Sequence, residues 1–145
     1  MRNCHSKSGQ NWIGLMKYLL DTNAIIALIS RRNRMDRRIR NQSPNAFGLS
    51  VIVLHELYFG AFKGRRTNET LARMTGLGLE LVAFNSDDAR CAAEARALLA
   101  TAGTPFGPYD ILIAGQALAR DLTLITHNTR EFSRVAGLRI EDWEA

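Results

Sequence analysis

The chain has 145 residues, of which 46% are hydrophobic and 23% are charged. These are the proportions of a folded globular domain, and they exclude disordered, collagen-like and disulfide-rich chains. At about 100–200 residues per domain, the length allows one domain with a substantial core. Lys and Arg number 19 against 14 Asp and Glu, and the net charge of +5 favours an anionic partner such as nucleic acid.

Cysteine content and hydropathy predict where the protein resides. Two cysteines are too few for the disulfide framework of a small secreted domain. No apolar run approaches the roughly 18 residues that a membrane span needs. We therefore expect a cytoplasmic protein without membrane contact.

The first 15 residues differ from the rest of the chain, because they are polar and show no hydrophobic pattern. They contain basic residues but no apolar stretch of the kind found in signal peptides. We interpret residues 1–15 as an extension or an expression remnant, poorly ordered unless something holds it. The domain is then 16–145, with Met16 as the expected native start.

Short apolar runs alternate with helical segments along the domain. The predicted strands are 18–20, 46–49, 81–84, 122–126 and, as a short fifth, 139–140. The predicted helices are 24–30, 51–63, 65–77, 87–102 and 110–120, with Thr22 or Asn23, Ser50 and Ser86 as caps of the first, second and fourth. The strands are apolar without alternation, which is typical of a parallel sheet covered on both faces. The fold class is therefore α/β.

Polar side chains follow the carboxyl ends of these strands, where open α/β sheets form their sites. Asp21 ends the first strand, and Thr126 and Asn128 follow the fourth. Asp110 opens a helix after a Gly/Pro loop, and Glu56 lies about two turns into the helix after the second strand. Clustered carboxylates repel one another unless a cation joins them. Oxygen ligands of this kind favour Mg²⁺ or Mn²⁺ over zinc.

A structural explanation competes with the metal site. Asp21 and Asp110 could each be a helix cap and nothing more. No cap explains Glu56, a mid-helix acid between Leu54 and Leu57, because an unpaired charge among apolar neighbours is costly.

Two histidines adjoin the candidate acids. His55 precedes Glu56 on the same helix, where consecutive residues face different directions, and His127 precedes Asn128 in a loop. Because neither has an evident partner, we interpret both as surface or packing residues rather than general bases.

The segment 31–40 holds six arginines and one aspartate. On a helix, Arg34, Arg37 and Arg38 would share one face, while Met35 and Ile39 would pack inward. The arginine face could bind the RNA backbone, bind an acidic protein segment, or simply be solvated.

Four blocks at these positions resemble the signature blocks of PIN-domain ribonucleases and, more narrowly, of the VapC toxins of bacterial toxin–antitoxin pairs. The blocks are LLDTN at 19–23, SVIVLHELYFG at 50–60, GPYDILIAGQ at 107–116 and THNTREF at 126–132. The ending VAGLRIEDW at 135–143 is similar too. The resemblance covers 16–143 in order.

The resemblance implies a three-layer α/β/α domain with a central parallel sheet of four to five strands. It also implies a Mg²⁺-dependent endoribonuclease, in which Mn²⁺ can substitute. Asp21 and Asp110 match positions that hold the metal, and Glu56 matches one that completes the ligand set or orients water. Many PIN domains have a fourth acid where this chain has Asn128, which puts a second metal site in doubt. The residues implied in support of phosphate, water or metal are Thr22, Asn23, Thr126 and Glu131.

The resemblance further implies partners. These are a structured RNA substrate, a small VapB-like antitoxin whose C-terminal segment covers the acidic site, and a second copy of the chain in a homodimer and in a toxin–antitoxin hetero-oligomer. Among RNAs, tRNA is favoured over mRNA, with initiator tRNA as a first guess.

Two other functions compete with this one. The first is a non-catalytic nucleic-acid-binding PIN module, in which Asn128 marks a decayed site; three retained acids argue against it, because a pure binder gains nothing from negative charge beside phosphate. The second is an aspartate-nucleophile phosphotransferase, which usually needs an acid just after the strand, where this chain has Thr22 and Asn23.

Overall fold

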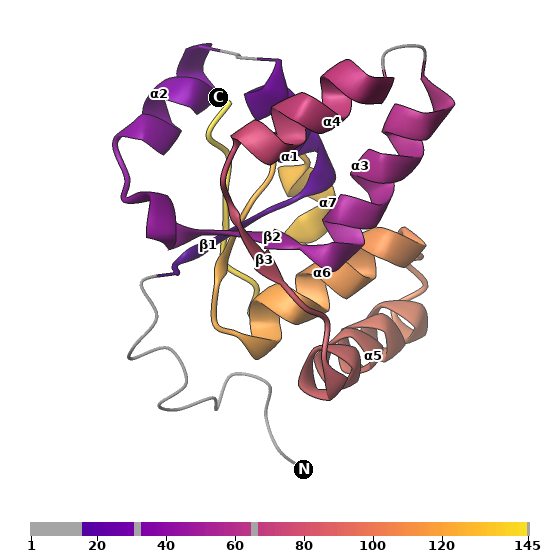
Figure 1. The fold of residues 1–145 in the computed structure, drawn as a ribbon. Helices are drawn as coiled ribbons and strands as arrows, with labels where there is room; N and C mark the ends of the chain where they lie inside the picture. The colour runs from indigo at the N-terminus through magenta and orange to yellow at the C-terminus, as the bar shows by residue number, and fades with distance from the viewer. Residues whose placement is uncertain (1–15, 31–32, 65–66, 145) are drawn as a thin grey trace.

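The computed structural model describes residues 16–30, 33–64 and 67–144 (Figure 1). Five parallel strands form one sheet in the order β3-β2-β1-β4-β5. The strands are β1 Tyr18–Leu20, β2 Phe47–Ser50, β3 Glu80–Val82, β4 Thr123–Ile125 and β5 Ile140–Glu141. The helices are α1 Thr22–Ile29, α2 Asn33–Arg40, α3 Val51–Lys63, α4 Thr67–Gly76, α5 Ser86–Thr101, α6 Pro108–Ala119 and α7 Thr129–Phe132, with a 3-10 turn at Pro44–Ala46.

The sheet separates two helical layers. In Figure 1, α1 and α4 lie above the strands and α5 and α6 lie below them. Helix α3 contacts α1, α4 and α6, so it joins the two layers at the end of the sheet where β2 finishes. The predicted three-layer α/β/α architecture with a parallel sheet is confirmed.

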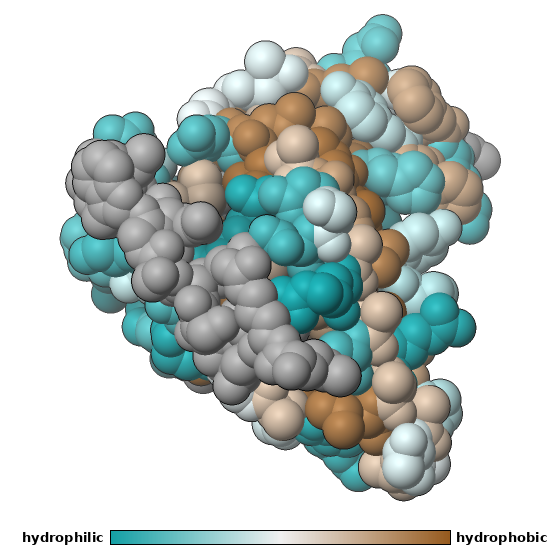
Figure 2. All heavy atoms as spheres, turned by 90° about the horizontal axis from the view of Figure 1, so that it is seen from below, coloured by the Kyte–Doolittle hydropathy of each residue, from teal (hydrophilic) through white to brown (hydrophobic). Residues whose placement is uncertain are grey.

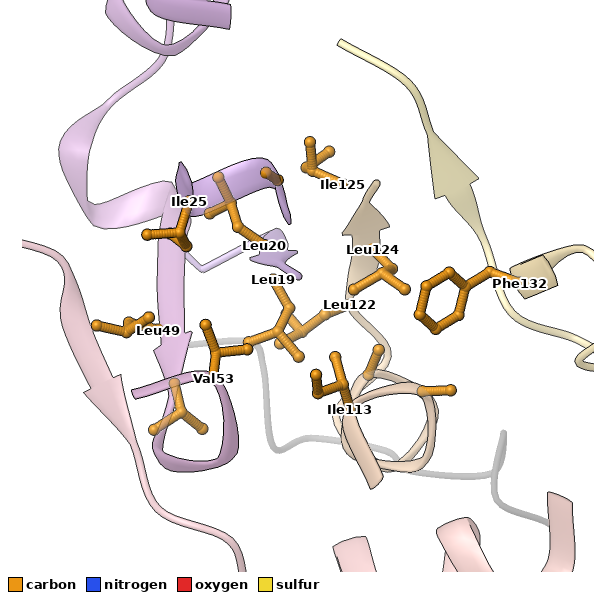
Figure 3. Packing of buried hydrophobic residues seen from close by; sticks show 14 of the residues in the cluster. Leu19, Leu20, Ile25, Leu49, Val53, Ile113, Leu122, Leu124, Ile125 and Phe132 are labelled. Carbon is orange, nitrogen blue, oxygen red and sulfur yellow. The ribbon is translucent and has the colours of Figure 1, made fainter. Parts of the chain in front are cut away.

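The core lies on both faces of the central strands. Successive side chains of a strand point to opposite faces, and Figure 3 shows Leu19 near Val53 and Ile113 while Leu20 lies near Ile25. All of these side chains are fully buried. The apolar run of β1 is therefore explained by burial on both faces, and it fixes where Asp21 emerges.

Several caps and boundaries differ from the sequence predictions. The cap of α1 is Asp21 rather than Thr22 or Asn23, because the Asp21 carboxylate accepts from the Ala24 backbone N–H. The cap of α5 is Asn85 rather than Ser86, because Asn85 and Asp88 form a reciprocal capping box.

Strand β3 ends at Val82, two residues before the predicted end. The carbonyl of the next residue, Ala83, accepts hydrogen bonds from Gln116 at 3.1 Å and Arg120 at 2.6 Å. The side chains of Gln116 on α6 and of Arg120 at its C-cap thus occupy a carbonyl that a longer β3 would have used for hydrogen bonding to the neighbouring strand. The short helix α7 was not predicted from the sequence.

No helix in the described part of the chain is long and apolar enough to cross a membrane. On the face seen in Figure 2, brown apolar patches alternate with teal hydrophilic residues where described residues are visible.

Cys91 is fully buried on α5. The cytoplasmic location stays a prediction. The interpretation of residues 1–15 lies outside the described residues.

Candidate active site

Asp21 lies at the carboxyl end of β1, with only 3% of its surface exposed. Its backbone N–H donates to the Ile125 carbonyl, which fixes its position beside β4. One carboxylate oxygen accepts from the Ala24 N–H at 2.8 Å, and the other accepts from the Thr126 hydroxyl at 2.5 Å. Asp21 is therefore a helix cap and also the best-anchored acid at this edge of the sheet.

Burial raises the pKa of Asp21 to about 6, against the lowering effect of the Thr126 and Ala24 hydrogen bonds. The negative charges of Asp110 and Glu144 raise the pKa further. Asp21, at the end of β1, is thus repelled by an acid of α6 and by an acid of the C-terminal segment.

Thr126 connects Asp21 to the loop after β4. Its hydroxyl donates to Asp21 and accepts from the Asn128 backbone N–H at 2.9 Å. The predicted supporting role of Thr126 has a geometric basis in this contact. Asn128 takes the cap position of α7 without a capping hydrogen bond from its side chain, which is half-buried.

Glu56 and Asp110 complete the acidic edge. The Thr22 hydroxyl donates to Glu56 Oε1 at 2.9 Å, which links α1 to α3. Burial raises the pKa of Asp110, and the charges of Glu56 and Glu131 raise it further. The sequence placed these acids at one edge of the sheet, and the structure brings them within electrostatic range of each other.

Two supporting candidates stand further from this cluster. Asn23 is exposed on the first turn of α1. Glu131 reaches Asp110 electrostatically, but it also forms a close ion pair with Arg134.

The acids suit a hard divalent cation, although they are not gathered tightly around one point. Among the described residues, no three His, Cys, Asp or Glu side chains converge closely enough to hold a metal ion. Within the described part of the chain, the charges that shift the pKa values of Asp21 and Asp110 nevertheless come from other acids. Oxygen donors that repel one another fit a divalent cation, which would supply positive charge between them.

The sequence analysis missed the contribution of the C-terminal segment. Glu144 raises the pKa of Asp21, and Asp142 bonds His127 at 3.0 Å, so His127 has a partner after all. Trp143, buried against Tyr18 and Phe47, anchors this segment. The one signal in the sequence was the position of 142–144 just beyond the last short strand, at the same edge as Thr126.

The predicted arginine surface lies on α2. Arg34 and Arg37 are exposed on this helix. The Arg38 guanidinium lies 4.9 Å from the centroid of the Trp143 ring and donates to the Asp142 carbonyl at 3.4 Å. Arg38 is exposed as well, so the role of Arg34, Arg37 and Arg38 in RNA binding stays a prediction, with Trp143 and the C-terminal backbone as additional contacts of Arg38.

Comparisons with known proteins agree with this geometry. The family model of the PIN domain matches residues 18–138. A relative from Salmonella typhimurium, named tRNA(fMet)-specific endonuclease VapC, is 40% identical over 131 residues, which are 89% of this chain and 99% of the relative. A relative of the same name from Shigella flexneri is 37% identical over 131 residues, which again cover 89% of this chain and 99% of the relative.

Solved structures give the same result. The crystal structure of DNA-bound VapBC from Salmonella typhimurium contains a chain that is 39% identical, with a TM-score of 0.84, covering 88% of this chain and 98% of that one. A chain in VapBC-1 from nontypeable Haemophilus influenzae is 31% identical, with a TM-score of 0.80, covering 90% and 100%.

Proposed function

The chain belongs to the PIN domain family and to its VapC ribonucleases, and from this membership we propose that it is a Mg²⁺-dependent endoribonuclease acting as the toxin of a toxin–antitoxin pair. The observation that carries the proposal is the convergence of Asp21, Glu56 and Asp110 at the carboxyl edge of the sheet. The raised pKa values of Asp21 and Asp110, and the repulsion that Glu56 exerts on Asp110, are features that a bound divalent ion would relieve.

Each residue has a definite task in this proposal. Asp21 and Asp110 hold the metal, and the Thr126 hydroxyl keeps the Asp21 carboxylate in one orientation. Glu56, oriented by Thr22, completes the ligand set or positions the attacking water. When bound, the ion supplies positive charge at the scissile phosphate and makes water more acidic. Asn128 has no charge to add, so one metal site is favoured over two.

The proposed substrate is tRNA, with initiator tRNA as the first candidate. The names of the Salmonella and Shigella relatives specify tRNA(fMet), and these relatives are matched over nearly their whole length. The proposed partners are a VapB-like antitoxin, which blocks the acidic edge, and a second copy of this chain. Their support is that the similar chains of Salmonella and Haemophilus occur in VapBC complexes.

The alternative of a non-catalytic RNA-binding module has less support. In a module that only binds RNA, the carboxylates of Asp21, Asp110 and Glu56 would repel the phosphates and lower the affinity for RNA. The relatives are moreover named as nucleases.

The substrate proposal is tested with purified initiator tRNA and a matched elongator tRNA, each incubated with the protein and Mg²⁺. We expect one specific cut in initiator tRNA, no cut in the elongator, and loss of cutting when the cognate antitoxin is added. Equal cleavage of both tRNAs would contradict the initiator specificity while leaving the ribonuclease activity in place.

A further inference from the structure

Two aromatic residues are the sequence neighbours of two acids of the proposed site. His55 immediately precedes Glu56 on α3, and Tyr109 immediately precedes Asp110 on α6. The two rings contact each other across the helices, with centroids 5.3 Å apart and planes tilted by 45°. Both side chains are exposed. The same two helices therefore carry both the acids and an exposed pair of contacting rings, one residue apart along each helix.

Further aromatic residues follow His55 along α3. Residues 55, 58, 59 and 62 follow the i, i+3, i+4, i+7 spacing that places side chains on one helical face. We call His55, Tyr58, Phe59, Phe62 and Tyr109 the aromatic ridge. Phe59 and Phe62 are 62% and 67% exposed, and the rings of Tyr58 and Phe62 stack at 5.9 Å. Large rings so far out of the core contribute little to folding and are typical of a binding surface.

We propose that the aromatic ridge stacks unpaired bases of the RNA substrate next to the scissile phosphate. This inference rests on the proposed ribonuclease function. Bases present flat π-faces, and sequence-specific RNA recognition relies on stacking splayed bases against exposed aromatic rings. The ridge begins one residue from Glu56 and from Asp110 along their helices, which puts it within reach of nucleotides that flank the cut.

The chemistry of the ridge favours RNA over an apolar protein segment. It is a narrow row that carries an imidazole, two phenol hydroxyls and, at its outer end, a cation. The Lys63 ammonium lies 5.6 Å from the centroid of the Phe59 ring, where it can meet a phosphate of the same strand. Aromatic rings combined with positive charge are used to bind single-stranded nucleic acid.

The test uses a single-stranded RNA containing 2-aminopurine, whose fluorescence falls when the base stacks. The full-length protein is titrated in EDTA, so that binding is measured without cleavage. We expect quenching with the wild type and with Tyr109→Phe, which keeps the ring. Tyr109→Leu and Phe59→Leu should lose most of the quenching and bind roughly tenfold more weakly, the size of one stacking contact. Leu98→Ala, at an exposed site on α5, is the control that should change nothing.

Unchanged quenching in both leucine variants would overturn the proposal. It would also be overturned if these variants kept RNA binding but lost affinity for the antitoxin or for a second copy of the chain, because the ridge would then be a protein interface. A wild-type protein that cleaves RNA in Mg²⁺ without quenching would refute the ridge alone. A protein that quenches but never cleaves would refute the ribonuclease proposal instead.

Discussion

At the scale of single residues, Asp21 has the most unusual environment. It is buried and held by two hydrogen bonds, yet the nearby charges that act on it are those of other acids. Its pKa, raised to about 6, means that the folded, metal-free protein binds a proton that the unfolded chain releases near pH 4. Between these values the stability of the metal-free protein falls as pH rises, and the loss is complete above about pH 6.

Asp21→Asn should remove this loss while abolishing metal-dependent cleavage. The shift from 3.8 to about 6 corresponds to about 3 kcal/mol of unfolding free energy. The amide can still accept from Ala24 and donate to Thr126, so we expect a metal-free variant that is more stable than the wild type at pH 7.5 but not at pH 4. Urea unfolding at the two pH values measures this difference. Glu80→Gln, at an exposed position on β3, should keep the wild-type pH dependence.

Asn128→Asp should tighten the binding of Mn²⁺, because each added ligand charge increases the attraction for a hard cation. The expected result is a lower dissociation constant in titration calorimetry, with the fold retained. Unchanged or weaker affinity would place Asn128 outside the metal site.

The sequence was sufficient to predict that Asp21, Glu56 and Asp110 lie near one edge of the sheet, because Asp21 ends a parallel strand and the other two acids lie on helices that were expected to begin near the same edge. It was not sufficient for Glu144. That residue reaches Asp21 only because β5 pairs with β4 and Trp143 is buried, and both facts depend on contacts distant in sequence. The cap of α1 was misassigned for a related reason, since a residue with a functional role can also satisfy the helix end.

At the scale of elements, the arginines of the basic helix α2 differ in their contacts. Arg34, Arg37 and Arg38 are all exposed, but the Arg38 guanidinium also contacts Trp143 and the Asp142 carbonyl of the C-terminal segment. The double variant Arg34→Gln/Arg37→Gln should weaken the binding of a single-stranded RNA and lower its salt slope by roughly 0.7 per lost phosphate contact. Arg38→Gln, the matched variant on the same helix, should instead reduce thermal stability slightly. A salt slope unchanged in the double variant would exclude α2 from the RNA surface.

The packing of α5 on α6 leaves no room for a side chain at Gly115. A Cβ built there would lie 2.4 Å from the Cα and Cβ of Ala92. Gly115→Ala should therefore force the two helices apart and lower the unfolding free energy by about 1–3 kcal/mol. Gly76→Ala, where a Cβ would meet nothing within 4 Å, should cost little. Equal effects of the two substitutions in chemical denaturation would show that the helices can separate freely.

The strand and helix order was predictable from apolar runs and turn residues, because buried parallel strands have a distinctive composition. The end of β3 was not, since Gln116 and Arg120 of α6 capture the Ala83 carbonyl, and no local pattern reports such a contact. The contact between Arg38 of α2 and Trp143 could not be predicted from the sequence either, because it depends on where the C-terminal segment packs.

At the scale of the whole molecule, the sheet order brings the ends of β1 and β4 together and places α3 and α6 beside them. The acids gather there in a chain whose net charge is +5. A basic protein with one acidic edge can attract RNA at long range and still repel it locally unless that edge is neutralised. This combination is consistent with the proposal that a divalent cation neutralises the acidic edge during the chemistry.

The most direct test of this account is cleavage of tRNA by the purified protein with Mg²⁺, with EDTA, and with Mg²⁺ added back, alongside Asp110→Asn. We predict cleavage by the wild type with Mg²⁺, none with EDTA, recovery on adding Mg²⁺ back, and none by a folded Asp110→Asn variant under any of these conditions. Cleavage that persists in EDTA, or at a near-normal rate in the Asp110→Asn variant, would contradict a metal-dependent site at this edge of the sheet.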